Sequence, residues 1–309
     1  MSARAPALRG TTRGLRAAPR RAAGMAVGGR MAGALARPAP GAVVTFAGVQ
    51  GGAGVSTLTL LACGAVTRAS GRPAVALDLA STTRGGLGVL AEAWSQTSVE
   101  RTAEHLLAGG VLARPYARSA GGVHIISDEP QALIAADQSA RLLLAATAAA
   151  VRAGAGDGEL AALARAHVQD AALEQLAAVN GRRAALAKLV RAARGPHSLV
   201  GVDLGLADDV LLAQGAALGD LHVWVVAARG EDLEVARRRL LCHEPAGARE
   251  LVLAWLPDGR RVGSAQLRGL GEARGCPVAR LARFDRAAGW AAREQACRSA
   301  LEALCSQLP

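Results

Sequence analysis

Lysine and aromatic residues are nearly absent from this sequence of 309 residues. Lys188 is the single lysine among 36 basic residues, and Phe, Trp and Tyr together make up 2% of the chain. This scarcity excludes a core built on aromatic rings. With 51% apolar residues, the core must consist of Ala, Leu and Val, and the chain is long enough for one large α/β domain or two small ones.

Acidic residues are absent from residues 1–40, which contain eight arginines. Subtracting these from the 36 basic residues leaves 28 against 25 acidic residues, so the net charge of +11 comes mostly from this segment. Its Ala/Gly/Pro/Arg composition predicts a disordered basic tail. Three interpretations of this tail remain open. It is an arm that binds an anionic surface such as nucleic acid or membrane, or a segment similar to a transit peptide. In the third, the true start of the protein is Met25 or Met31. Outside the tail we expect no nucleic-acid binding.

Long hydrophobic runs and paired cysteines are also lacking. No stretch approaches 18 apolar residues without a charge, and no signal-peptide core is present, which predicts a soluble cytoplasmic protein. The five cysteines include no C-x-x-C pair and are odd in number, which favours reduced thiols. The six histidines show no metal-ligand spacing.

Short apolar segments alternate with helical ones along the chain. Most are continuously apolar, which is typical of parallel strands covered on both faces. Their alternation with helices predicts an α/β fold over residues 41–309, with a doubly wound, mostly parallel sheet and helices on both faces. The predicted strands are Ala42–Phe46, Ala74–Leu79, Val123–Ile126, Leu199–Val202, Leu221–Ala227, Glu250–Trp255 and Pro277–Leu281.

Two segments do not follow this alternation. Residues 131–194 are rich in Ala, Leu and Arg and predict a helical insertion without a strand. The C-terminal segment places apolar residues at near-helical spacing but lacks the basic face of a membrane anchor. We expect it to pack onto the domain, with peripheral membrane association as the alternative. These residues are Trp290, Cys297, Leu301, Leu304 and Cys305.

A glycine cluster lies between the first predicted strand and an apolar helix, in TFAGVQGGAGVSTLTL (residues 45–60). Such glycines let backbone N–H groups surround phosphate oxygens at the N-terminus of the helix. Ser56 is placed to bind Mg²⁺ and Thr57 to contact an α-phosphate. The lysine that ordinarily follows the last glycine is replaced by Val55. The alternative is a tight turn whose glycines only allow close packing of helix on sheet.

Two acidic residues end apolar strands. Asp203, in SLVGVDLG, has a Walker-B-like setting in which the strand directs the carboxylate at the metal of the glycine loop. Asp78 ends PAVALD about two dozen residues after the glycines, where a Rossmann-type dinucleotide-binding enzyme holds a ribose hydroxyl. The glycines do not give G-x-G-x-x-G, because Thr57 takes the last place, and this argues against the dinucleotide alternative.

These motifs together resemble the MinD/ParA group of deviant-Walker P-loop ATPases over residues 42–309. The matching segments are FAGVQGGAGVSTLTLLACGAV, AVALDLAST and HSLVGVDLGLADD. Within the group the chain looks most like CpaE/TadZ-type pilus-assembly proteins and septum-site-determining proteins of actinobacteria, a branch that departs from the P-loop lysines. The resemblance implies a homodimer that binds ATP or ADP with Mg²⁺. It also implies a role in placing pilus, secretion or cell-division machinery at a cell pole or septum.

Departures from the family pattern decide how much activity is expected. The two family lysines fall on Gln50 and Val55, and the acid linked to hydrolysis falls on Ala80. Losing one lysine weakens binding by about 10–100-fold, and charge on the transferred phosphoryl contributes about 10³–10⁵ in rate. We therefore expect weak or vestigial nucleotide binding with little intrinsic hydrolysis; an ATPase stimulated by a partner is the alternative.

The resemblance also implies which residues form the site, without identifying catalytic ones. Ser56 and Asp203 would bind Mg²⁺. The implied nucleotide-binding residues are Gly48, Gln50, Gly51, Gly52, Ala53, Gly54, Val55, Ser56, Thr57 and Asp78.

Overall fold

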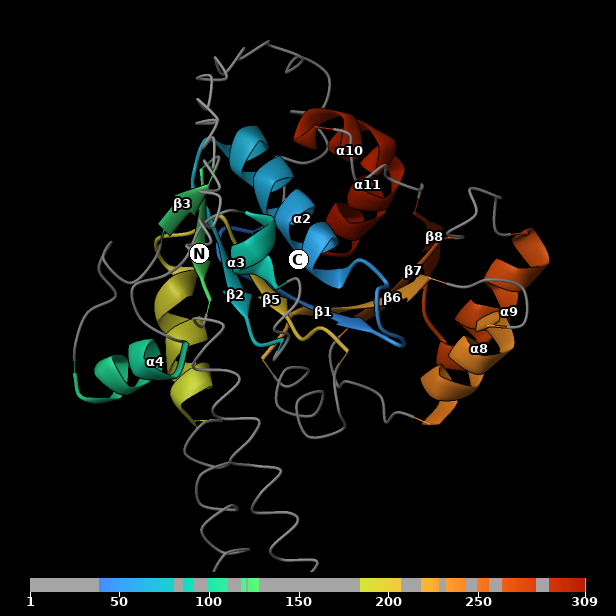
Figure 1. Ribbon diagram of the computed structural model, residues 1–309, viewed down its shortest axis with the longest axis horizontal. Coiled ribbons are helices and arrows are strands. Elements are labelled where there is room, and N and C mark those ends of the chain that lie inside the picture. The colour runs from blue at the N-terminus through green and yellow to red at the C-terminus, as the bar shows by residue number, and fades with distance from the viewer. Residues whose placement is uncertain are drawn as a thin grey trace, which may run out of the picture.

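The computed structural model of the chain describes eleven segments (Figure 1). The predicted basic tail, apart from residues 39–40, and residues 131–183 of the predicted helical insertion lie outside them. The described residues are 39–80, 86–91, 99–109, 118–120, 122–127, 184–206, 218–227, 232–242, 249–255, 263–281 and 289–308.

The apolar segments form an eight-stranded sheet in the order β3-β4-β2-β5-β1-β6-β7-β8. Every neighbouring pair is parallel except β3 and β4, which are antiparallel. All seven predicted strands are present. The strands are β1 (Ala42–Gly48), β2 (Ala74–Asp78), β3 (Arg118–Ala120), β4 (Val123–Ile126), β5 (Leu199–Asp203), β6 (Leu221–Ala227), β7 (Arg249–Trp255) and β8 (Val278–Arg280).

Strand β3 was not predicted, because its three residues, Arg-Ser-Ala, carry no apolar run. It forms through its pairing with β4, in which Arg118 lies opposite Ile125 and Ala120 opposite Val123. An edge strand of this kind is stabilised by backbone hydrogen bonds to its neighbour.

Helices cover both faces of the sheet (Figure 1), which confirms the doubly wound α/β fold. The central strands β1, β2, β5 and β6 are buried along their whole length, as expected for parallel strands between two helical layers. One layer contains α2 (Val55–Ser70), α3 (Leu87–Leu90), α10 (Trp290–Ala296) and α11 (Arg298–Gln307). The other contains α4 (Val99–Leu107), the helical residues 184–194, α8 (Asp232–Cys242) and α9 (Ser264–Arg274).

The C-terminal segment packs onto the domain. Cys297, Leu301 and Leu304 are buried in the same apolar core as α2, and Trp290 is 41% exposed. All five cysteines are free thiols. Within the described ranges, no helix has the length and apolar character needed to cross a membrane.

Close packing of α2 on β5 brings the glycine loop to the end of that strand. A Cβ on Gly201, in β5, would lie 2.7 Å from Sγ of Cys63 and 3.1 Å from Cγ2 of Thr59, both in α2. Any larger residue at position 201 would therefore push the helix away from the sheet. The glycine keeps the N-terminus of α2 beside Asp203, the last residue of β5.

Candidate functional site

The glycine loop occupies residues 49–54, between the end of β1 and the start of α2 (Figure 1). Gly52 and Gly54 have φ angles of +74° and +89°, a left-handed conformation that costs other residues about 1–2 kcal/mol. Gly51 and Gly52 are exposed, and a Cβ on either would meet nothing within 4 Å among the described residues. The rim of the loop is therefore open, as a backbone cradle for an anion requires.

Val55, at the place of the ordinary P-loop lysine, lies in the core. Its side chain is only 6% exposed, and its Cγ2 is 3.0 Å from the position of a Cβ on Gly48. Residues 38–67 contain no charged side chain at all. The positive potential that this segment itself offers a phosphate thus comes from backbone N–H groups and the N-terminus of α2.

Asp203 lies beside this loop and is fully buried. Its Oδ1 accepts a hydrogen bond from the Gly205 amide at 2.8 Å, whereas its Oδ2 has no hydrogen-bond partner among the described residues. Burial raises the pKa of Asp203, and the nearby Ser56 hydroxyl and Gly205 amide lower it by less. An unsatisfied carboxylate oxygen beside a hydroxyl is a costly arrangement that a hard cation would satisfy.

The oxygen atoms of Ser56 and Asp203 fit Mg²⁺ better than they fit a metal ion whose ligands all come from the protein. In the part of the chain that the structure describes, no group of three or more His, Cys, Asp and Glu residues could hold a metal ion. Mg²⁺ is commonly held by one or two protein oxygens, waters and substrate phosphates. Ser56 and Asp203 would supply the protein oxygens, and the bound ion would neutralise charge on phosphate oxygens.

Asp78 lies next to Asp203, at the paired position on the neighbouring strand β2. Its Oδ1 accepts from the Ala80 amide at 3.2 Å, and its Oδ2 accepts from the Leu87 amide at 2.9 Å and the Ser127 hydroxyl at 3.0 Å. Burial and the adjacent Asp203 raise the pKa of Asp78. Asp78 thus joins the end of β2 to the start of α3 and to Ser127, directly after β4.

Two side chains from distant parts of the sequence hold the carbonyl groups of the loop. Nη1 of Arg239, in α8, donates to the Val49 carbonyl at 2.5 Å across a separation of 190 residues. Nε1 of Trp255, at the end of β7, donates to the Ala53 carbonyl at 2.9 Å across 202 residues. The loop is therefore supported at both ends by the second half of the chain.

Sequence reasoning missed Ser127, Arg239 and Trp255. Ser127 carries the same signal that pointed to the two aspartates, a polar residue directly after an apolar strand, and could have been found. Arg239 and Trp255 carry no local signal. Their role depends on how α8 and β7 lie beside β1, which the strand order decides.

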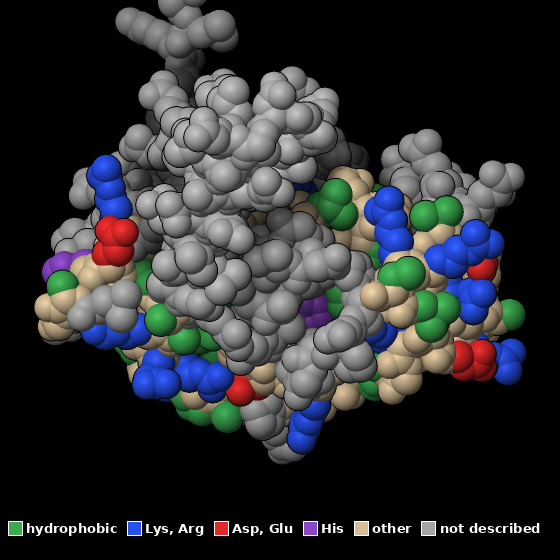
Figure 2. Space-filling model, turned by 90° about the horizontal axis from the view of Figure 1, so that it is seen from below, with side chains coloured by type: hydrophobic (Ala, Val, Ile, Leu, Met, Phe, Trp, Pro, Cys, Tyr) green, Lys and Arg blue, Asp and Glu red, His purple; other side chains and the backbone are tan. Residues whose placement is uncertain are grey.

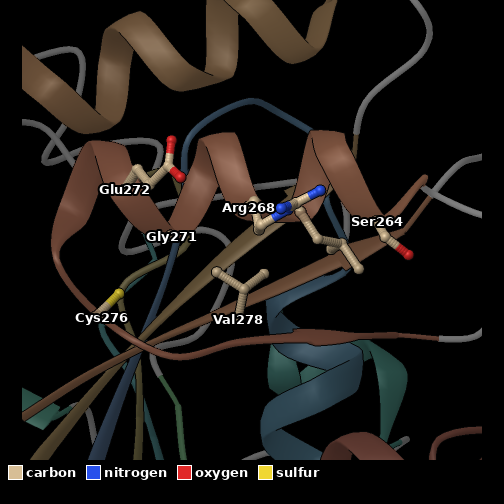
Figure 3. Close-up of a pocket in the computed structure, with 7 residues that line it drawn as sticks. Ser264, Arg268, Gly271, Glu272, Cys276 and Val278 are labelled. Carbon is tan, nitrogen blue, oxygen red and sulfur yellow. The ribbon is translucent and has the colours of Figure 1, made fainter.

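Two surface hollows lined by described residues involve none of the predicted site residues. Between α9 and the edge strand β8 lies an open hollow of about 360 Å³, in which Arg268 and Glu272 of the helix are seen above Cys276 and Val278 (Figure 3). A second hollow, of about 180 Å³, lies between α2 and α10, where Arg68 forms an ion pair with Glu294. The loop at the carboxyl edge of the sheet therefore remains the candidate nucleotide site.

The strand order argues against a dinucleotide-binding enzyme. In the Rossmann order the first two strands are neighbours. Here β5 lies between β1 and β2, so Asp78 is two strands away from the glycine loop. This insertion of a strand between the loop strand and the next one brings Asp203, rather than Asp78, beside the loop.

Comparisons with known proteins support this fold. No protein-family model matches the sequence, and no curated protein matches it. A ParA family ATPase from Chlorobium tepidum TLS aligns with a TM-score of 0.51 and 15% identity, covering 86% of this chain and 98% of that one. The chain thus has the α/β fold of P-loop NTPases, in its ParA-like form.

Two further solved structures are similar at lower scores. Cobyrinic acid a,c-diamide synthase from Mycobacterium smegmatis, with bound ATP analog and magnesium, aligns with a TM-score of 0.47 and 16% identity, covering 87% of this chain and 98% of that one. A plasmid partition protein from Borrelia burgdorferi aligns with a TM-score of 0.45 and 11% identity, covering 86% and 99%.

Proposed function

We propose that this chain is a MinD/ParA-type protein of the CpaE/TadZ-like or septum-site-determining kind. It would bind ATP or ADP with Mg²⁺ weakly and hydrolyse ATP slowly without help. It would work in the cytoplasm as a localisation or assembly factor, as a homodimer in contact with pilus, secretion or cell-division machinery. Peripheral association with the membrane at a pole or septum is part of this proposal.

The observation that carries the proposal is a glycine loop that keeps the backbone conformation of a phosphate-binding loop but lacks its lysine side chains. Gly52 and Gly54 keep the left-handed backbone of the loop, and Ser56 lies beside Asp203, whose Oδ2 has no hydrogen-bond partner among the described residues. The side chain of Val55 is buried against Gly48 and offers a phosphate no charge. This backbone geometry supports the proposed binding, while the charge that accelerates phosphoryl transfer is missing from the loop.

Binding and hydrolysis respond differently to this loss. Backbone N–H groups, the N-terminus of α2 and Mg²⁺ each favour a bound polyphosphate, so affinity falls by about 10–100-fold for one missing lysine. The rate falls further, because stabilising the transferred phosphoryl contributes about 10³–10⁵. A protein of this kind would therefore bind nucleotide more readily than it hydrolyses it.

Calorimetric titration of the full chain with Mg·ATP and Mg·ADP tests the proposal. We expect wild-type binding to weaken by at least 10-fold in Gly54→Val, which forces a branched residue into a left-handed position, and in Asp203→Ala, which removes the metal ligand. Glu302→Gln, an exposed substitution on α11, is the control and should bind as wild type does.

Binding that neither substitution alters would exclude this loop as the site. Phosphate release that appears only when a partner or membrane is added, and disappears in Asp203→Ala, would identify the chain as a stimulated ATPase instead.

A further inference from the structure

We infer that Arg239 supplies, from within the same chain, the positive charge that the glycine loop has lost. The inference rests on the proposed nucleotide site and assigns that site a phosphate-binding residue. Arg239 lies in α8, far in sequence from the loop, and no motif identifies it.

The position of Arg239 is set by a direct contact with the loop. Its Nη1 is 2.5 Å from the carbonyl oxygen of Val49, the first residue after β1. Arg239 is exposed, whereas Val49 is buried, and this carbonyl is the one hydrogen-bond acceptor of Arg239 among the described residues. A guanidinium has five N–H donors in a planar fork, so one donor can hold the loop while others face a phosphate.

The neighbouring arginines of α8 behave differently. Arg237 and Arg238 both bind Glu234 at the exposed surface of the helix. Figure 2 shows arginine side chains at the surface on the side of the molecule where α8 and α9 lie. Among the arginines of α8, Arg239 is the one directed at the loop, and its charge is not matched by a carboxylate in the described part of the chain.

The charges around the loop explain why a cation is needed there. Asp78 and Asp203 lie at the carboxyl edge of the sheet, and no charged side chain occurs between residues 38 and 67. Without Mg²⁺ and a cation, a polyphosphate would approach two buried carboxyl groups. In the described ranges, Arg239 is the cationic side chain that hydrogen-bonds to this loop.

Four substitutions separate charge from support of the loop. Arg239→Lys keeps the charge, Arg239→Gln keeps a donor for the Val49 carbonyl without the charge, and Arg239→Met keeps neither. Arg238→Met is the matched control, since it removes a neighbouring exposed arginine that binds Glu234 instead of the loop. Each full-length variant is titrated by calorimetry with Mg·ATP and with Mg·tripolyphosphate, and its folding is checked by circular dichroism.

We expect Arg239→Gln and Arg239→Met to weaken the binding of both probes by about 10–100-fold, the effect of one charged hydrogen bond. Arg239→Lys and Arg238→Met should stay within about 3-fold of wild type, because they retain a cation at the loop. Raising the salt concentration should weaken wild-type binding of tripolyphosphate more than that of Arg239→Gln.

The inference is overturned if Arg239→Gln binds tripolyphosphate as tightly as wild type, since the residue would then only hold the loop. The comparison of Arg239→Gln with wild type remains valid even if Arg239→Met fails to fold. Wild-type protein that binds neither probe would refute the proposed nucleotide site together with the inference. Wild-type binding that survives in every Arg239 variant would refute the inference alone.

Discussion

Asp78 and Asp203 occupy paired positions on neighbouring parallel strands, so two carboxyl groups are buried together at the carboxyl edge of the sheet. Burial raises the pKa of both groups, and the adjacent Asp203 raises that of Asp78 further. The folded protein therefore binds protons more tightly at this pair than the unfolded chain does. The stability from these groups is present below the unfolded pKa of about 4 and is lost as the pH rises through the raised values.

Asp203→Asn should consequently stabilise the protein at pH 8. It removes one of two charges while keeping an oxygen for the Gly205 amide. We expect the free energy of unfolding to rise by about 1–3 kcal/mol at pH 8, and this gain to vanish near pH 4. Urea unfolding at both pH values measures it. Mg²⁺ should stabilise wild type but not the variant; a variant less stable than wild type at pH 8 would contradict this account.

His197 should make stability depend on pH in the opposite direction. Burial lowers its pKa, and His124, whose Nδ1 is 3.0 Å from Nε2 of His197, and Arg72 lower it further. The unfolded chain then takes up a proton near pH 6.5 that the folded chain resists, so this contribution is full above that pH and is lost below it. The advantage of wild type over His197→Gln in chemical unfolding should shrink from pH 7.5 to pH 5. An advantage that stays constant would show that His197 does not titrate.

The buried ion pair of Arg274 and Glu250 should be the most sensitive polar contact between α9 and β7. Two hydrogen bonds of 2.6 and 2.9 Å join side chains that are 4% and 7% exposed. Arg274→Met removes the guanidinium partner of a buried carboxylate and should reduce the free energy of unfolding by about 3–5 kcal/mol. Arg237→Met, which breaks the exposed pair with Glu234, is the control and should leave thermal unfolding unchanged. Similar losses in the two variants would show that burial does not decide the effect.

Trp255→Phe should loosen the glycine loop while keeping an aromatic ring in place. The variant loses the indole donor to the Ala53 carbonyl, a net contribution of about 1 kcal/mol. We expect that loss in unfolding experiments, together with a weaker affinity for Mg·ATP, because the backbone before Gly54 is held less firmly. Trp290→Phe, at a position 41% exposed, is the comparison. If both variants bind nucleotide alike, the hydrogen bond of Trp255 does not support the site.

Much of the fold and part of the site follow from local sequence. The strands were predictable because continuous apolar runs are typical of parallel strands between two helical layers. The turn before α2 was predictable because its glycines adopt left-handed backbone conformations that other residues disfavour. Ser56 and Asp203 were predictable as neighbours because parallel strands end at one edge of a sheet. Strand β3 was not, since a short polar edge strand depends on its partner for its hydrogen bonds.

The sequence by itself determined that a glycine loop without charge precedes an apolar helix, and that two acids end apolar strands. Only the tertiary structure decided that β5 lies between β1 and β2, and that Arg239 and Trp255 hold the carbonyl groups of the loop. The physical reason is the sequence separation over which each interaction acts. Backbone conformation and burial are encoded within a few residues, whereas a hydrogen bond across about 200 residues exists only once the strand order has brought its two ends together.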